Sequence, residues 1–428
     1  MNQLHTGTIA HLLGNPFKQS NCLEIIEDGG IWIDGAGRIL AVGDRRELLH
    51  KIDSETAIYS HDGAWLLPGL VDAHLHFPQY YAVAAANKGL LSWLNETIFP
   101  AEMEFQDAGF AQKAANQLIS HLIRGGVTTA AVFGSQFPEA TMALFESAKQ
   151  QGLRLISGLT LMDQGGPEAL RLSPEKAEEL SQRFIDYCRD EPLLHYALMP
   201  RFALSCSPVM LAMCGEILKA NPDCYLQTHI NESQEEIAAV KQLFPNAKYY
   251  LDVYDHYDLL GSKTLLIHNI HAGDEELQRI AEAGGAVCHC PSSNLFLGSG
   301  LFPLERHLAY EIPLALGTDI GAGLHFTVWQ ETQDAYKIQQ LQQCRLSPEQ
   351  LLYLITLGGA QALRLAHETG NFEKGKSADF FVLQPQKNGY LTERLKRCPD
   401  LPSQLFVLMQ LTGEALVSER YIGGISTV

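Results

Sequence analysis

The sequence lacks any apolar run long enough to cross a bilayer, and its N-terminal segment lacks the basic stretch, apolar core and small-residue cleavage site of a signal peptide. Neither a membrane anchor nor secretion is therefore expected. Internal repeats, low-complexity tracts and long charge runs are also missing. We predict a soluble, cytoplasmic protein.

Positive charge is scarce. Lys and Arg number 31 against 49 Asp and Glu, which gives a formal net charge of −18. An acidic surface of this size repels phosphate backbones and anionic lipids. Neither a nucleic acid nor a membrane is therefore an expected partner.

A disulfide framework is not expected either. The nine cysteines, an odd number, lie mostly in apolar surroundings, and we predict that they are reduced thiols of the core. The densest cluster is Cys288-His289-Cys290. Because neighbouring residues of a strand point to opposite faces, these three side chains are not expected to converge on one metal ion.

From residue 68 onward, short β-branched or leucine-rich runs alternate with longer amphipathic stretches, the pattern of β/α units with a parallel sheet. Eight runs are predicted to be strands, namely 70–74, 127–133, 153–160, 195–203, 224–229, 264–268, 286–290 and 313–318. Eight units close a (β/α)8 barrel of the TIM type, with its active site at the carboxyl ends of the strands. Helices are predicted at 107–124, and from Ser173, which has the position of an N-cap.

The two ends of the chain have a different texture. Residues 1–67 alternate apolar stretches with turn residues, which is typical of β-hairpins. After an apolar helix predicted at 351–366, β texture returns at 370–383, 404–411 and 414–422.

Neither terminal region is long enough to bury a core alone. We therefore predict that 1–67 and 371–428 form one composite β-sandwich domain beside a catalytic barrel domain at 68–370. The stretch 77–104 is too long for an ordinary connection, and we interpret it as a lid or pocket wall.

Side chains that bind metals stand at the ends of four predicted strands. They are His74 and His76 on the first strand, His229 on the fifth, His268 on the sixth and Asp319 on the eighth. Residues two apart on a strand point the same way, so the first two can share one ion. Each residue alone could be a hydrogen-bonded strand end or an ordinary turn, but four agreeing placements favour a metal site.

Three imidazoles and one carboxylate suit zinc or iron(II), with water completing the site. Such an ion makes water acidic enough to act as a nucleophile near neutral pH. Glu232 follows three residues after His229 and is not needed as a ligand, so it is available as a general acid or base. The pattern predicts a hydrolase.

These motifs resemble those of the amidohydrolase superfamily, and most closely its guanine deaminase branch. The likeness covers nearly the whole chain and runs through Pro68-Gly-Leu-Val-Asp-Ala-His-Leu-His-Phe-Pro-Gln79, Pro200-Arg-Phe-Ala-Leu-Ser-Cys206, His229-Ile-Asn-Glu232, His289-Cys-Pro-Ser-Ser-Asn294 and Gly317-Thr-Asp-Ile-Gly-Ala-Gly323. The other zinc deaminase scaffold, with His-x-Glu and Pro-Cys-x-x-Cys, is absent.

The resemblance implies hydrolysis of guanine to xanthine and ammonia by a homodimer. It implies one Zn²⁺ per chain, with Fe²⁺ as an alternative, held by His74, His76, His229 and Asp319. A single ion is favoured because two-metal members use a lysine from strand four, and 195–203 contains none. His268 would orient the water, and Glu232 and Asp319 would move protons. The implied substrate contacts are His76, Gln79, Arg201, Phe202, His229, Glu232 and Asp319.

Two features depart from the closest pattern. The residues after Cys206 are Ser-Pro-Val-Met, without an acidic side chain, and His271 is a second candidate beside His268. Alternative functions are an aminohydrolase or chlorohydrolase of another flat heterocycle, such as an oxidised purine, a pterin or a triazine, and a non-catalytic metal-holding scaffold. A scaffold would need neither Glu232 nor His268, which disfavours it.

Overall fold

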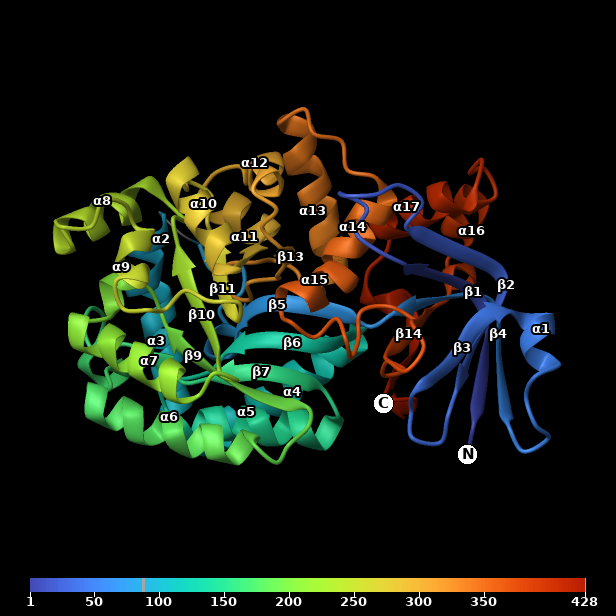
Figure 1. Ribbon diagram of the computed structural model, residues 1–428, viewed down its shortest axis with the longest axis horizontal. Helices are drawn as coiled ribbons and strands as arrows, with labels where there is room; N and C mark the ends of the chain where they lie inside the picture. Colours follow the sequence, from blue (N-terminus) through green and yellow to red (C-terminus); the bar gives the residue numbers. More distant parts are fainter. Residues whose placement is uncertain (87–88, 428) are drawn as a thin grey trace.

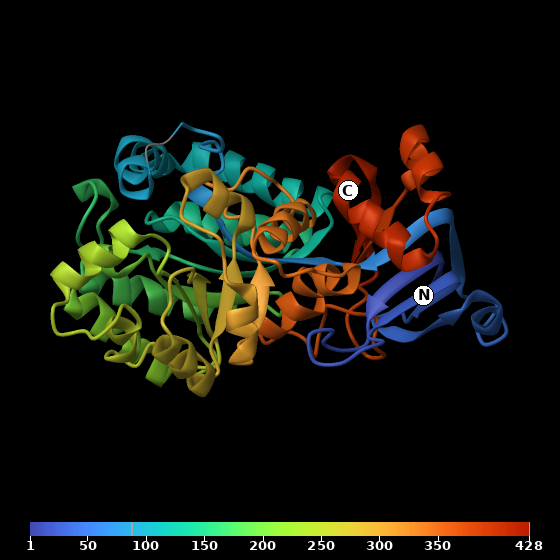
Figure 2. The ribbon, with the colours of Figure 1, turned by 90° about the horizontal axis from the view of Figure 1, so that it is seen from above.

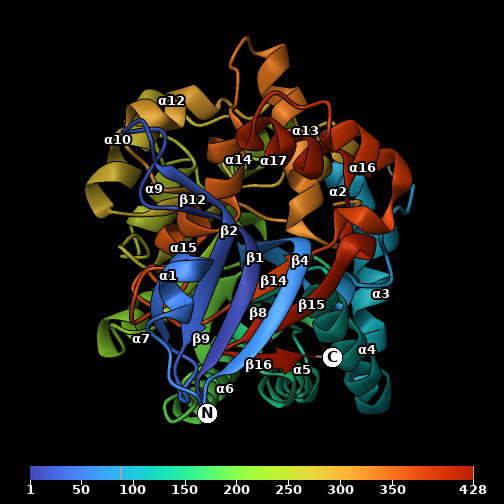
Figure 3. The same ribbon diagram turned by 90° about the vertical axis from the view of Figure 1, so that its right-hand side faces the viewer.

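Two β-sheets lie side by side in the computed structural model, which describes residues 1–86 and 89–427 (Figure 1). One is a ring of parallel strands with helices around it, and the other combines strands from both ends of the chain. Both termini lie on the side of the second sheet (Figure 3). In the part of the chain that is described, no helix is both long and apolar enough to cross a membrane.

The ring is the predicted (β/α)8 barrel. Its strands, in order, are β5 (Leu70–His76), β6 (Val127–Phe133), β7 (Arg154–Gly158), β9 (Leu194–Pro200), β10 (Tyr225–Ile230), β11 (Thr264–His268), β12 (Ala286–His289) and β13 (Leu314–Leu316). All eight predicted strands are present, with ends shifted by a few residues. The run 153–160 is divided, since β8 (Thr160–Leu161) pairs separately with β9.

The ring closes where the last strand meets the first. The backbone N–H of Asp319 donates to the carbonyl of His74 over 2.8 Å, and the N–H of His76 donates to the carbonyl of Ile320 over 2.7 Å. Asp72, fully buried on β5, accepts hydrogen bonds from the backbone N–H (3.0 Å) and hydroxyl (2.7 Å) of Thr318. The closing bonds therefore lie at the carboxyl ends of β5 and β13.

Helices in the connections surround the ring (Figure 2). They are α4 (Ala108–Arg124), α5 (Pro138–Gln151), α6 (Pro174–Cys188), α7 (Pro208–Ala220), α8 (Gln234–Leu243), α9 (Leu251–Asp255), α10 (Asp274–Ala283), α11 (Pro291–Leu297), α12 (Leu304–Ala309) and α13 (Val328–Leu341). Asp107 caps α4 through the N–H of Phe110, and Ser173 caps α6 through the N–H of Lys176. Both predicted helix starts are confirmed.

The long segment after β5 folds into short helical turns. They are η1 (Phe77–Gln79), α2 (Leu90–Trp93), η2 (Leu94–Ile98), α3 (Phe99–Met103) and η3 (Glu104–Gln106). Trp93 and Phe99 belong to an apolar cluster with Met162 and Phe202, which follow β8 and β9. The segment therefore packs over the carboxyl ends of barrel strands; its residues 87–88 lie outside the described part.

The second sheet has seven strands. In order they are β16 (Ile425–Thr427), β15 (Val417–Ile422), β14 (Phe380–Leu383), β4 (Ala57–Pro68), β1 (Gln3–Leu12), β2 (Leu23–Ile33) and β3 (Ile39–Asp44), with α1 (Arg45–Leu49) after the last. Ile9, Ile31 and Phe380 from separate strands share one apolar core. As expected, the two ends of the chain build this unit together.

Two predictions of secondary structure are wrong. The run 404–411 lies in helix α17 (Leu401–Leu411), because Asp400 caps this segment through the N–H of Ser403 and Pro402 occupies the first turn. The single helix predicted at 351–366 is two, α14 (Pro348–Leu354) and α15 (Leu357–Ala362). Between them the carbonyl of Ile355 accepts the N–H of Val71 on β5, so β5 interrupts the helix.

The remaining short elements are η4 (Glu168–Leu170), η5 (Ala203–Ser205), η6 (Pro385–Lys387), α16 (Gly389–Leu395) and η7 (Glu414–Leu416).

A buried ion pair joins the two sheets. Arg154 of β7 and Asp379, just before β14, are 1% and 3% exposed and lie 2.9 Å apart. Replacing Asp379 with Ala should lower the free energy of unfolding by about 3 kcal/mol, the lower end of the range for breaking a buried ion pair. The variant removes the buried partner of the guanidinium and leaves only the more exposed Glu368 carboxylate, 3.3 Å from Arg154 Nη2. Urea unfolding measures this. The matched control is Asp62→Ala, which removes an exposed partner of Arg45 and should change stability little; equal effects of the two variants would contradict the prediction.

Candidate active site

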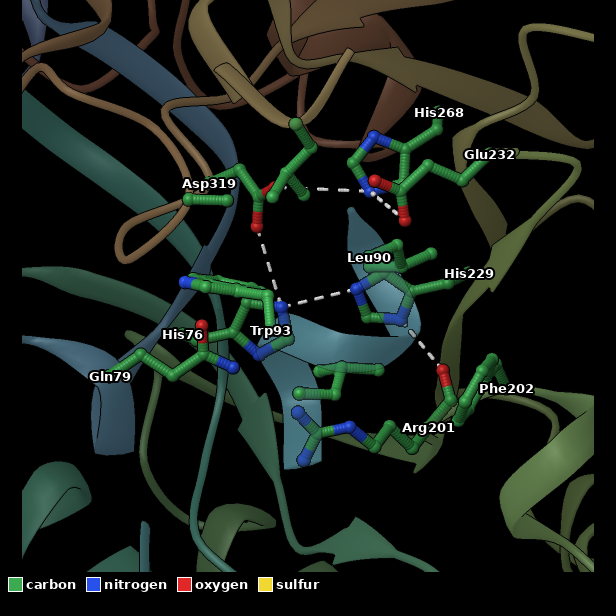
Figure 4. A pocket seen from close by; sticks show the side chains of 13 residues that line it. His76, Gln79, Leu90, Trp93, Arg201, Phe202, His229, Glu232, His268 and Asp319 are labelled. Carbon is green, nitrogen blue, oxygen red and sulfur yellow. Dashed lines mark hydrogen bonds and ion pairs between the residues drawn. The ribbon is translucent and has the colours of Figure 1, made fainter. Parts of the chain in front are cut away.

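A cavity opens at the carboxyl ends of the barrel strands (Figure 4). Strand-end polar side chains line one part of it, and apolar side chains of the 77–104 segment line another. The lining residues are His76, Gln79, Leu90, Trp93, Leu94, Arg201, Phe202, His229, Glu232, His268, Leu297, Asp319 and Ala322. All the residues predicted to contact a substrate are among them. Leu90, Trp93 and Leu94 belong to the 77–104 segment, which was predicted to be a lid or pocket wall, whereas Leu297 and Ala322 were not predicted.

The four predicted metal ligands converge at one end of this cavity. His74, His76, His229 and Asp319 each offer one ligand atom, and the four atoms lie within 4.8 Å of one another. Asp319 Oδ1 is 3.1 Å from His74 Nε2 and 3.4 Å from His76 Nε2. The Nε2 atoms of His76 and His229 are 3.1 Å apart.

The chemistry of this group fits a divalent cation. His229 donates its Nδ1 hydrogen to the carbonyl of Arg201 over 2.6 Å, so its Nε2 carries a lone pair, directed towards His76 and Asp319. Burial, reinforced by the neighbouring histidines, holds the pKa of His76 and His229 well below the ordinary value, so both rings are neutral. Both ring nitrogens of His74 are buried, and among the described residues neither makes a hydrogen bond of good geometry, although Nε2 lies 3.1 Å from Asp319 Oδ1. Converging lone pairs beside a carboxylate are what a metal ion satisfies.

Glu232 lies next to the metal group rather than in it. Ser233 caps α8, and the Glu236 carboxylate accepts the backbone N–H of Glu232 over 2.9 Å, which fixes this residue beyond β10. Glu232 Oε2 is 3.5 Å from His268 Nε2. Burial, and to a smaller extent the charge of Asp319, raises the pKa of Glu232 to about 8. This carboxyl group can therefore hold a proton at neutral pH.

The structure decides between the two candidate histidines after β11. His268 lines the cavity and donates from Nδ1 to Asn294 Oδ1 over 2.9 Å, which leaves Nε2 directed towards Glu232 and Asp319. His271 Nε2 instead bonds the carbonyl of Ser299 over 2.8 Å. The sequence motif contains Asn294, but its role in orienting His268 was missed.

Gln79, Arg201 and Phe202 stand on the other side of the cavity (Figure 4). Gln79 and Arg201 share one buried partner, the Glu102 carboxylate, at the end of the 77–104 segment. The guanidinium of Arg201 also lies 5.1 Å from the centre of the Phe99 ring. Glu102 was not predicted from the sequence, because the 77–104 segment stands out only by its length.

The cysteines are free thiols, as predicted, and no disulfide occurs among the described residues. Cys290 nevertheless lies close to the site, where it forms a second possible metal group with His268 and Asp319. Burial raises the pKa of the Cys290 thiol well above its ordinary value. Without an ion at this position the thiol therefore stays protonated.

Comparison with known proteins places this site in a family. The model of the amidohydrolase family matches residues 65–408, and the chain belongs to that family. Guanine deaminase of Escherichia coli (strain K12) is 37% identical over 416 residues, which are 97% of this chain and 94% of that protein. Within the amidohydrolases, the chain thus groups with the guanine deaminases.

Solved structures agree with this grouping. The structure of E. coli guanine deaminase has a TM-score of 0.94 at 35% identity and covers 100% of this chain and 99% of its own. Guanine deaminase from C. acetobutylicum, with guanine bound in its active site, has a TM-score of 0.92 at 27% identity, and the match covers 100% of both chains.

The bonds of Asp72 across the closure of the barrel generate a testable prediction. Asp72→Asn should weaken binding of a divalent metal by about 10- to 100-fold, because Asp72 sets the distance between the strand ends that carry His74 and Asp319. Competition with a chromogenic chelator measures this affinity. Asp190→Asn, in an exposed turn, is the control, and an Asp72 variant with the affinity of that control would show that the closure does not position the ligands.

Proposed function

We propose that this protein is a metal-dependent hydrolase that converts guanine and water to xanthine and ammonia. One observation supports the proposal most directly: three sets of side chains meet at a single cavity. They are the possible metal ligands, the pair Glu232 and His268, and the pair Gln79 and Arg201. The relatives named above are guanine deaminases, and the C. acetobutylicum enzyme is described with guanine in its active site.

The resident ion is proposed to be one Zn²⁺ per chain, with Fe²⁺ as the alternative. His74, His76, His229 and Asp319 would hold it. When bound, such an ion acts as a Lewis acid and lowers the pKa of water. The protein side chains then have to place the purine and move two protons.

Glu232 is proposed as the general acid. Its raised pKa keeps a proton available, and transfer of this proton to the ring nitrogen beside the amino-bearing carbon makes that carbon more electrophilic. His268 Nε2 lies 3.5 Å from Glu232 Oε2 and 3.8 Å from Asp319 Oδ2. It is therefore placed to orient the attacking water, whose first proton Asp319 Oδ2 can accept and pass to the departing ammonia. The second proton of that water leaves the new oxygen as the C–N bond breaks and returns to Glu232, which restores the acid.

The opposite side of the cavity suits a flat, polar heterocycle. Leu90 and Trp93 offer apolar surface to the ring, and Phe202 offers an aromatic one. Guanine carries acceptors at O6 and N7, which a guanidinium can bind. Arg201 is proposed to provide that donor, with Gln79 beside it.

The proposed function is tested by ammonia release from guanine, adenine, cytosine, a pterin and an amino-triazine. Guanine should have the highest kcat/KM. A higher value for another heterocycle would favour the alternative aminohydrolase, and no release from any of them would favour the scaffold. Light scattering tests the proposed homodimer.

The metal content is expected to be one zinc per chain in protein expressed with metal in excess. His76→Ala should lose both the metal and the turnover, because truncation of a ligand leaves the ion under-coordinated. Elemental analysis checks both statements. Two metals per chain, or none, would contradict the proposed mononuclear site.

Glu232→Gln should keep its metal and still bind guanine, because the substitution changes one atom and leaves the metal group intact. Its kcat should fall by about 10² to 10⁴, the usual contribution of a general acid or base. Stopped-time ammonia assays and guanine binding by calorimetry give the two values. Near-normal turnover would remove Glu232 from the mechanism.

A further inference from the structure

A buried carboxylate that does not line the cavity joins the two side chains assigned to the purine edge. Glu102 is 0% exposed. It accepts two hydrogen bonds from Arg201 Nη1, at 2.9 and 2.7 Å, and one from Gln79 Nε2 at 3.0 Å. A third donor, Gln136 Nε2, lies 2.9 Å from its other oxygen. Two of its three partners, Gln79 and Arg201, line the cavity, so this carboxylate connects the side chains proposed to bind the purine.

These bonds fix which polar atoms remain for a ligand. An ionised carboxylate only accepts hydrogen bonds, so Gln79 must turn its NH₂ group towards Glu102. Its Oε1 atom is then directed away, 3.4 Å from the N–H of Gly321. Arg201 uses Nη1 on Glu102, and among the described residues its other guanidinium donors have no hydrogen-bond partner. This side of the cavity therefore offers a ligand one acceptor, Gln79 Oε1, next to the donors of Arg201.

We infer that Glu102 is a positioning residue, which fixes the acceptor of Gln79 next to the donors of Arg201. The site thereby selects a cyclic amide, that is, a ring carbonyl next to a ring N–H. The carbonyl binds Arg201 and the N–H binds Gln79 Oε1. Guanine has this pair at O6 and N1. The inference rests on the proposed function and adds to it the reason for discrimination at the 6-position.

The test compares guanine with 2-aminopurine, which carries the same amino group but has neither the 6-oxygen nor the N1 hydrogen. In Glu102→Gln the new amide cannot accept from every donor, so Gln79 and Arg201 lose their fixed orientation. We expect KM for guanine to rise and its kcat/KM to fall by about 10- to 100-fold, the range for hydrogen bonds to charged groups. The kcat/KM for 2-aminopurine should change little.

Matched variants separate positioning from folding. Glu104→Gln makes the same change two residues away, at an exposed position, and should behave as wild type. Glu102→Asp keeps the negative charge beside Arg201 but is one methylene shorter, so it should fold and lose part of the preference for guanine. Arg201→Met gives the preference expected when the donor itself is absent.

An equal fall for both purines, or no fall for either, would overturn the inference. If Glu102→Gln does not fold, an unchanged preference for guanine over 2-aminopurine in Glu102→Asp would also overturn the inference. Turnover by the wild type distinguishes failure of this inference from failure of the proposed function. If the wild type deaminates guanine and both Glu102 variants keep the preference for guanine over 2-aminopurine, only the role of Glu102 is contradicted. A wild type that does not deaminate guanine contradicts the proposed function, and the inference with it.

Discussion

The closure of the barrel between β5 and β13 is the constraint on which the rest of the site depends. A parallel ring must join its first and last strands, and here β13 is only three residues long. Backbone bonds from His74 and His76 to the segment after β13 make the join, and the buried Asp72 reinforces it. The same residues thus close the fold and carry the metal-type side chains. A distortion of this closure would therefore first change the distances between the proposed metal ligands.

The 77–104 segment supplies what the barrel alone does not. It adds apolar walls through Leu90 and Trp93 and places Glu102 behind Gln79 and Arg201. The cavity therefore has two ends with different chemistry. At the end formed by the strand termini, imidazole and carboxyl groups lie close together and suit bond breaking. At the other end, the acceptor of Gln79 and the donors of Arg201 have fixed positions, which suits recognition of a purine.

The barrel and its strand-end residues could be predicted from the sequence because their signals are local. Apolar runs, caps such as Asp107, and histidines two apart on a strand can each be read within a few residues. The misread helix at 401–411 shows the limit, because an apolar run does not by itself distinguish strand from helix. Glu102 could not be found in this way, since its partner Arg201 is 99 residues away and their meeting depends on how the intervening segment folds. The choice between His268 and His271 likewise required geometry.

The central proposal is that a metal held at the closing strands and the side chains positioned by Glu102 act on the same purine. A crystal structure of the zinc-loaded protein with xanthine, with anomalous data collected at the zinc edge, tests it directly. We expect one anomalous peak, bound by His74, His76, His229 and Asp319, and the 6-oxygen of xanthine at Arg201. A peak on other residues, two peaks, or a purine turned with its 6-oxygen away from Arg201 would contradict it.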